Sequence, residues 1–148
     1  GLGKALAMLF CRFGAMVVVI GKDEALNNKL LSEATTDGFS IEVFRADLAS
    51  VTELKDVFGR ILAKHNRIDI LINNAGISYF EEVKAIDEQK AQEMLDVNLR
   101  AVYLATKICL PGMLEKGCGT IVNISSIWGK TGRGAGSVAS RRRLGDVA

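Results

Sequence analysis

The sequence lacks the residues that build disulfide frameworks, zinc sites and hydrolase active sites. It has 3 cysteines and 1 histidine in 148 residues, and no two cysteines have the Cys-x-x-Cys spacing of a metal site. An odd number of cysteines does not suggest a disulfide framework either. The single histidine, His65, is accompanied by no Gly-x-Ser-x-Gly motif, which argues against hydrolase chemistry. These features predict a reducing, cytoplasmic setting and no metal site.

Long hydrophobic runs and a strong charge of one sign are also missing. The apolar stretch 5–20 is interrupted by Arg12 and Gly14 and falls short of the ~20 residues that span a bilayer. The formal net charge is only +2, and the arginines at 141–143 supply much of it. Neither a membrane nor a nucleic acid is therefore expected as a partner. No signal peptide is visible, and a chain that opens on Gly1 instead of Met is expected to be a fragment.

Apolar patterning predicts helices that alternate with short buried strands. A hydrophobic content of 49% suits one globular domain, here a single partial domain over 1–148. Helix 50–65 has two candidate N-caps, Ser50 and Thr52. Strands that alternate with helices predict an α/β fold with a doubly wound parallel sheet. The expected helices cover 2–13, 23–36, 50–65, 87–96 and 98–116, and the expected strands cover 16–20, 41–45, 68–72 and 120–124.

Candidate functional residues follow four of the predicted strands. Ligands of doubly wound sheets bind at the carboxyl ends of the strands, so residues from distant parts of the sequence are expected at one edge. The four segments are Gly21-Lys22, Asp47-Leu48, Asn73 to Gly76, and Ser125-Ser126.

The stretch Asp69 to Gly76, a strand that runs into an Asn-Asn-Ala-Gly turn, resembles the signature of short-chain dehydrogenases/reductases. Further segments resemble the same family, and the resemblance covers about residues 1–138. It implies a Rossmann-type fold and hydride transfer between a nicotinamide dinucleotide and a small-molecule alcohol or carbonyl substrate. It also implies a homo-oligomer. The further segments are Gly1-Leu2-Gly3, Ala46-Asp47-Leu48, Met94 to Tyr103, and Ile121 to Ser126.

The start of the first helix and the residue after the first strand are expected to contact the pyrophosphate and the adenosine part of the cofactor. Gly1, Leu2 and Gly3 would let backbone N–H groups at a helix start approach the pyrophosphate, although a plain glycine turn before a helix is the alternative. Lys22 favours NADP(H) over NAD(H), since a basic residue here meets a 2′-phosphate. Asp23 turning inward, or a solvated Lys22, would remove that preference.

The residues after the next two strands are expected around adenine, ribose and nicotinamide. The resemblance implies that the Asp47-Leu48 pair lies at adenine, with the Asp47 carboxylate accepting from its amino group, while helix capping near Ser50 is the competing role. Asn74, Ala75 and Gly76 would pass beneath the adenosine ribose and the nicotinamide side. Asn73 is instead expected to link neighbouring strands through its amide.

Two positions are implied in catalysis. Asn98 matches the asparagine that holds a water of the family's proton relay, and a place on a solvated helix face is the alternative. Ser126 matches the serine that hydrogen-bonds the substrate carbonyl oxygen, where it polarises the carbonyl and does not attack it.

The family's catalytic tyrosine and lysine have no counterpart in this chain. The only tyrosines, Tyr79 and Tyr103, precede Ser126, whereas the family places its tyrosine about a dozen residues beyond that serine. Counting without gaps puts Ala139 and Arg143 at the two positions, and the other register gives Ser137 and Arg141.

We therefore expect an aberrant tail over 139–148, which a frame error in the coding DNA would explain, and impaired chemistry. The family's first strand is also expected to be missing, which in the strand order 3-2-1-4-5 leaves two exposed strand edges and poor autonomous folding.

Two other classes of function stay open. A non-catalytic dinucleotide-binding or regulatory protein would keep the cofactor site without the proton donor. Nucleic-acid binding rests only on the arginines 141–143 and would require strong, salt-dependent affinity.

Overall fold

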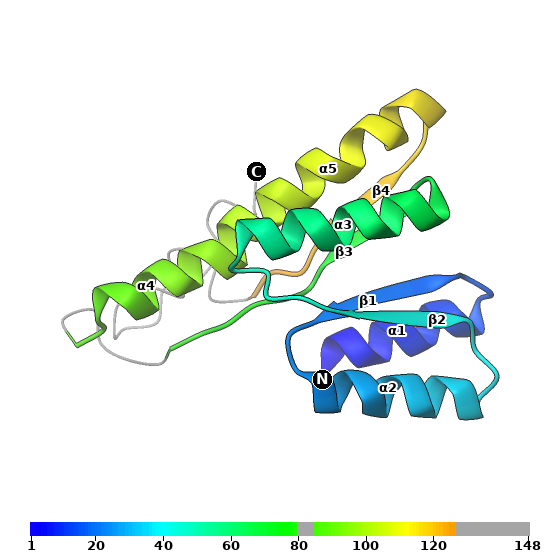
Figure 1. Cartoon of the computed structure of the whole chain (residues 1–148), viewed down its shortest axis with the longest axis horizontal. Helices are drawn as coiled ribbons and strands as arrows, with labels where there is room; N and C mark the ends of the chain where they lie inside the picture. The colour runs from blue at the N-terminus through cyan, green and yellow to red at the C-terminus, as the bar shows by residue number, and fades with distance from the viewer. Residues whose placement is uncertain (80–84, 127–148) are drawn as a thin grey trace. The chain divides into compact units, whose positions relative to one another are not determined.

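The computed structural model describes residues 1–79 and 85–126 (Figure 1). Every predicted helix and strand in this part is confirmed, with bounds shifted by up to three residues. The expected tail 139–148 lies outside the described residues. The elements are α1 (Leu2–Arg12), β1 (Val17–Gly21), α2 (Glu24–Thr36), β2 (Ile41–Arg45), α3 (Val51–His65), β3 (Ile70–Asn73), α4 (Glu88–Leu95), a π-helical turn (Asp96–Arg100), α5 (Ala101–Lys116) and β4 (Thr120–Asn123).

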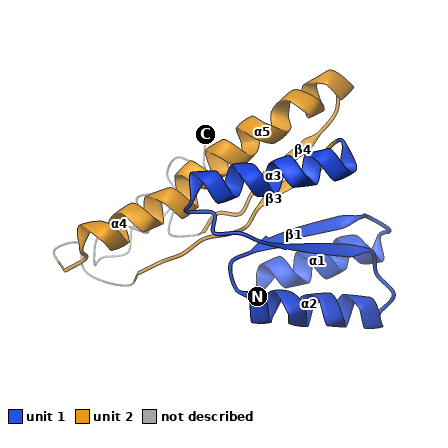
Figure 2. Ribbon diagram, viewed as in Figure 1, with its two compact units in different colours: residues 1–66 blue, residues 67–148 orange. Residues whose placement is uncertain are grey.

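The chain divides into two compact units, residues 1–66 and residues 67–148 (Figure 2). The first unit contains α1, β1, α2, β2 and α3. The second contains β3, α4, the π-helical turn, α5 and β4.

Each unit has one pair of parallel strands. In the first unit β1 pairs with β2, from Val17 opposite Ile41 to Gly21 opposite Arg45. In the second unit β3 pairs with β4, and Asn73 stands opposite Asn123 at their carboxyl ends. A helix lies between the two strands of each pair along the chain, as parallel pairing requires. The pairs are those expected for neighbours 3-2 and 4-5, and the fold is Rossmann-type with an incomplete sheet.

The first unit has a small apolar core between two helices and its strands. The helical spacing of small and apolar residues on α1 and α2 buries one face of each helix. Half-buried Val17, Val19 and Val43 pack against this core from the strands. Gly14, with φ of 80°, allows the reversal between α1 and β1. The buried residues of this cluster are Ala7, Cys11, Leu30, Ala34 and Ile41, and α3 also buries Leu54, Val57, Phe58 and Ile61.

Helix α3 begins and ends as its sequence dictates. The Ser50 Oγ accepts from the Glu53 backbone N–H at 3.3 Å, so Ser50 is the N-cap and the alternative, Thr52, is not. Asn66 ends the helix with φ of 65°, a conformation that asparagine tolerates. His65 is half-buried, with Nε2 at 3.3 Å from Glu42 Oε2.

The second unit contains a helical segment in which α4 continues through the π-helical turn into α5. The two predicted helices, 87–96 and 98–116, form one continuous segment, because the backbone stays helical from Glu88 to Lys116. One face of this segment is buried throughout, and Gly117 ends it with φ of 72°. The buried side chains belong to Met94, Val97, Asn98, Ala101, Ala105, Cys109 and Met113.

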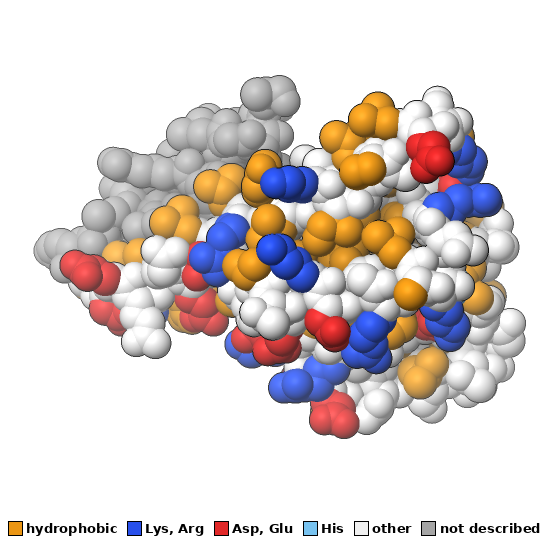
Figure 3. All heavy atoms as spheres, turned by 45° about the horizontal axis from the view of Figure 1, so that its top comes forward, with side chains coloured by type: hydrophobic (Ala, Val, Ile, Leu, Met, Phe, Trp, Pro, Cys, Tyr) orange, Lys and Arg blue, Asp and Glu red, His pale blue; other side chains and the backbone are white. Residues whose placement is uncertain are grey.

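Large apolar side chains remain exposed in both units. Phe13 is 83% exposed and Leu26 65% exposed in the first unit, and Leu114 is 70% exposed in the second. Apolar side chains, in orange, are also visible among charged ones on the face shown in Figure 3. Among residues 1–79 and 85–126, no helix has the length and apolar character needed to cross a membrane.

Candidate functional site

The start of α1 is the first part of the candidate site. Gly1 is the N-cap and provides no side-chain hydrogen bond to the first turn, while its carbonyl accepts from the Ala5 N–H at 3.3 Å. Gly1 and Leu2 are exposed and Gly3 is half-buried. A Cβ at Gly1 would meet no atom within 4 Å, so packing does not explain this glycine. The N–H groups of a helix start attract anions.

Lys22 and Asp47 form an ion pair just beyond the carboxyl ends of β1 and β2. The parallel register places Gly21 opposite Arg45, so the residues that follow are neighbours. Lys22 Nζ lies 2.7 Å from Asp47 Oδ2, and the Asp47 Oδ1 accepts from the Ala49 N–H at 3.0 Å. The Lys22 ammonium holds the pKa of the Asp47 carboxyl below its usual value, against the opposing effect of burial.

The structure excludes helix capping as the role of the Asp47 carboxylate. Ser50 caps α3, so the Asp47 carboxylate is not the helix cap. The backbone of Asp47 is fixed instead, since its N–H donates to the Glu53 Oε2 at 2.9 Å. Leu48 follows as a half-buried residue in the same turn.

Asp23 and Asn27 organise the loop between β1 and α2. The Asp23 carboxylate caps α2 by accepting from the Leu26 N–H at 2.9 Å. Asn27 Nδ2 donates to the Gly21 carbonyl at 2.9 Å, and a Cβ at Gly21 would lie only 2.3 Å from Asn27 Oδ1. Sequence reasoning missed Asn27, because nothing in a polar helical residue indicates which carbonyl it reaches.

In the second unit, amide groups line the carboxyl ends of β3 and β4. Asn73 Nδ2 donates to Asn123 Oδ1 at 2.8 Å, which confirms the expected link between neighbouring strands. The Asn74 N–H donates to the Ile72 carbonyl at 3.0 Å and thereby starts the turn. Asn74 is half-buried, while Ala75 and Gly76 are exposed.

Asn98 fixes the loop that follows this turn. Its Oδ1 accepts from the Ile77 N–H and its Nδ2 donates to the Ile77 carbonyl, both at 2.8 Å. Only 2% of Asn98 is exposed, so the solvated-face alternative is wrong. The residue lies in the π-helical turn, a distortion that is frequent at functional sites.

The hydroxyl groups of the second unit have different surroundings. Ser126 follows β4 and is half-buried. The Tyr79 hydroxyl donates to Glu93 Oε2 at 2.5 Å, and Lys90 lies 5.6 Å from the centre of the Tyr79 ring. Tyr103 is 60% exposed on α5. In the described ranges, no group of three or more His, Cys, Asp or Glu residues is placed to hold a metal ion.

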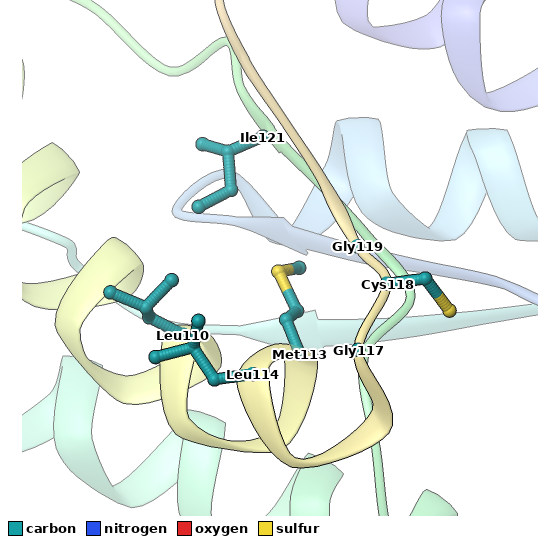
Figure 4. Close-up of a pocket in the computed structure, with 7 residues that line it drawn as sticks. All are labelled: Leu110, Met113, Leu114, Gly117, Cys118, Gly119 and Ile121. Atoms are coloured by element: carbon teal, nitrogen blue, oxygen red, sulfur yellow. The ribbon is translucent and has the colours of Figure 1, made fainter.

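An apolar hollow of about 430 Å³ lies in the second unit, between the end of α5 and the start of β4 (Figure 4). Leu110, Met113 and Leu114 line it from the helix, and Ile121 lines it from the strand. A Cβ at Gly119 would lie 2.4 Å from Met113 Cγ, so only glycine fits above this side chain. The hollow adjoins the amino end of β4 and is therefore separate from the polar residues at the carboxyl end.

The parallel strand pairs, their crossover helices and the polar residues beyond the strand ends define a Rossmann-type protein. The short chain dehydrogenase family matches residues 1–140, and the chain belongs to this family.

Relatives and solved structures extend the similarity over nearly the whole chain. The 3-oxoacyl-[acyl-carrier-protein] reductase FabG of Thermotoga maritima is 30% identical over 129 residues, which are 87% of this chain and 52% of that protein. A metagenomic short-chain oxidoreductase solved with NADP has a TM-score of 0.93 and 29% identity, over 98% of this chain and 66% of its own.

A second solved structure, actinorhodin polyketide ketoreductase with NADPH, also has a TM-score of 0.93 and 29% identity, over 99% of this chain and 57% of its own. The chain thus spans about half the length of the curated relative, at 52%.

Proposed function

We propose that the protein is an NAD(P)(H)-dependent oxidoreductase that transfers hydride between nicotinamide and an alcohol or carbonyl carbon. The observation that carries the proposal is the position of the polar residues, which follow the carboxyl ends of the parallel strands in each unit, in a chain of the short chain dehydrogenase family. The substrate is a small molecule of the alcohol or carbonyl class. A homo-oligomer and a cytoplasmic setting remain predictions for the whole protein.

The first unit would bind the adenosine part of the cofactor. The N–H groups at Gly1, Leu2 and Gly3 suit the pyrophosphate, and the Asp47 carboxylate, with Leu48 beside it, suits the adenine amino group. Lys22 would meet a 2′-phosphate, so NADP(H) is favoured over NAD(H). The capping role of Asp23 supports this preference, because its carboxylate already accepts from the Leu26 N–H. The NADP and NADPH in the two solved neighbours agree with it.

The second unit would act at the nicotinamide and the substrate. Asn74, Ala75 and Gly76 would lie along the ribose and nicotinamide, since their small or compact side chains permit close approach. Ser126 would donate to the substrate carbonyl oxygen and polarise it. Asn98 would hold a relay water, with its side chain keeping the loop at Ile77 in place. The nicotinamide supplies or accepts the hydride.

Proton exchange is the step for which residues 1–79 and 85–126 place no suitable side chain. The Tyr79 hydroxyl is committed to Glu93, and a serine hydroxyl is too weak an acid to replace a phenol. Turnover by this chain is therefore expected to be impaired. The same observation favours the second candidate function, a non-catalytic dinucleotide-binding or regulatory protein.

Calorimetric titration of the chain with NADPH and with NADH tests the proposal. Both are expected to bind, NADPH more tightly, and K22M should weaken NADPH alone. The matched control is K64M, because Lys64 makes a comparable 2.7 Å ion pair with Glu42. Binding of neither dinucleotide by the folded chain contradicts the proposal. Because turnover by this chain is expected to be impaired, the full-length gene separates the two candidate functions: a tyrosine and a lysine in the active-site helix select the enzyme, and their absence selects the non-catalytic alternative.

A further inference from the structure

The ion pair between Lys22 and Asp47 joins two residues that the proposed function assigns to different parts of one cofactor. Lys22 would bind the 2′-phosphate, and Asp47 would accept from the adenine amino group. Here they bind one another, with Lys22 Nζ 2.7 Å from Asp47 Oδ2. The ammonium that a 2′-phosphate requires is thus already held by a carboxylate of the same unit.

We infer that Asp47 is a specificity-determining residue, whose carboxylate competes with the 2′-phosphate of the cofactor for the Lys22 ammonium. The inference rests on the proposed function. When a 2′-phosphorylated dinucleotide binds, Lys22 leaves Asp47 for the phosphate, whereas the contact of Asp47 with the adenine amino group is the same for both dinucleotides. When an unphosphorylated dinucleotide binds, the ion pair stays closed. Asp47 therefore reduces the preference for NADP(H) that Lys22 creates.

The side chain of Lys22 is freer to move than that of Asp47, so Lys22 is the partner that moves. Asp47 is fixed on both sides, because its N–H donates to Glu53 and its Oδ1 accepts from the Ala49 N–H. Its side chain is 27% exposed, whereas that of Lys22 is 63% exposed. A long, exposed lysine side chain reorients easily, so the ammonium leaves while the carboxylate stays in place.

The relative strengths of the two contacts make the exchange favourable. Exposed ion pairs contribute little to stability, so opening this one costs little. A phosphate monoester carries a charge of about −1.5 to −2 at neutral pH and attracts the ammonium more strongly than one carboxylate does. Only binding of the phosphorylated ligand requires the Lys22–Asp47 ion pair to break. The Asp47 carboxylate therefore weakens binding of that ligand alone and lowers its selectivity.

Adenosine 2′,5′-bisphosphate and adenosine 5′-monophosphate are the probes that isolate this effect. Their dissociation constants are measured for the full chain and for K22M, D47N and the double variant K22M/D47N. Asparagine keeps an oxygen that can accept from the Ala49 N–H, so D47N retains the turn. The matched control is E42Q, since Glu42 and Lys64 also pair at 2.7 Å with side chains 22% and 60% exposed. Circular dichroism verifies that every variant is folded.

The preference for the bisphosphate is the dissociation constant of the monophosphate divided by that of the bisphosphate. It is expected to rise about two- to fivefold in D47N, because an exposed ion pair contributes about 0.2–1 kcal/mol. In K22M the preference should fall to about one. Adding D47N to K22M should change it little, because the ammonium for which the Asp47 carboxylate competes is already gone. E42Q should leave the preference unchanged.

An unchanged or lower preference in D47N, in a chain that binds both probes, overturns the inference and leaves the proposed function intact. A folded chain that binds neither probe contradicts both.

Discussion

At the scale of single residues, buried polar side chains have partners that no sequence pattern names. For Asn98 the sequence left a solvated helix face open as an alternative, and the burial of the residue excludes it. Its partner, the backbone of Ile77, could not be predicted, because it depends on the path of a loop 21 residues earlier in the chain. Asn73 was predictable, since parallel strands in register bring matching positions together.

Replacing Asn98 with alanine is expected to release the loop at Ile77. Both hydrogen bonds between the Asn98 amide and the Ile77 backbone would be lost, at a cost of about 1–3 kcal/mol. Hydrogen exchange at the Ile77 amide should accelerate roughly tenfold or more. Asn28→Ala, an exposed asparagine on α2, is the control and should leave this amide unaffected. Unchanged protection of Ile77 in Asn98→Ala would show that the contact does not hold the loop.

The Asp47 carboxyl is expected to titrate below its ordinary pKa of 3.8, chiefly because the Lys22 ammonium donates to it. Since the pKa is lower in the folded chain, the ion pair stabilises the fold above the ordinary value, and this contribution disappears as the pH falls through the depressed pKa. In K22M the pKa should move upward. Carboxyl-resolved NMR titration measures it, and an Asp47 pKa that is the same in both proteins would show that Lys22 does not cause the shift.

At the scale of helices and strands, local rules predicted most of the boundaries. Ser50 and Glu53 lie three residues apart before an apolar helical pattern, and the structure places the N-cap there. The π-helical turn between α4 and α5 was not predictable in the same way. Residues 96–100 have the composition of an ordinary helix, and the π-helical turn is apparent only from the backbone hydrogen bonds.

Ser50→Ala is expected to destabilise α3 by about 1 kcal/mol, the usual cost of removing an N-cap. The Glu53 N–H would lose its acceptor at the start of the helix. Thr52→Ala, at the other position that the sequence allowed, should change the free energy of unfolding much less. Urea unfolding followed by circular dichroism measures both. A larger loss of unfolding free energy for Thr52→Ala than for Ser50→Ala would show that Thr52, and not Ser50, is the N-cap.

At the scale of the whole molecule, hydrophobic periodicity predicted the alternation of strands and helices and hence the parallel pairing. The chain order of the elements needs only local patterns. Which strands pair needs long-range contacts, and here the family resemblance supplied the strand order. The sequence did not predict how much apolar surface each unit leaves exposed, as Phe13 and Leu114 do.

The exposed apolar side chains are expected to bind the dye ANS and to accompany a broad thermal transition. The buried cluster that α1, α2 and the strands of the first unit share is small, and little buried area means weak cooperativity. Leu114→Ser should reduce dye fluorescence without loss of helix signal, because Leu114 is 70% exposed. Leu54→Ser, at a fully buried position on α3, should instead lower the helix signal. A sharp transition without dye binding would contradict this prediction.

The contact between Met113 and Gly119 makes the end of α5 sensitive to oxidants in a specific way. Met113 is 6% exposed, and its side chain occupies the space that a Cβ on Gly119 would need. Conversion of the thioether to a sulfoxide adds a polar oxygen among the apolar side chains that line the hollow. Peroxide should therefore reach the exposed thiol of Cys118 first and modify Met113 only when the helix end separates from β4. The rate of sulfoxide formation then reports how often this corner of the second unit opens.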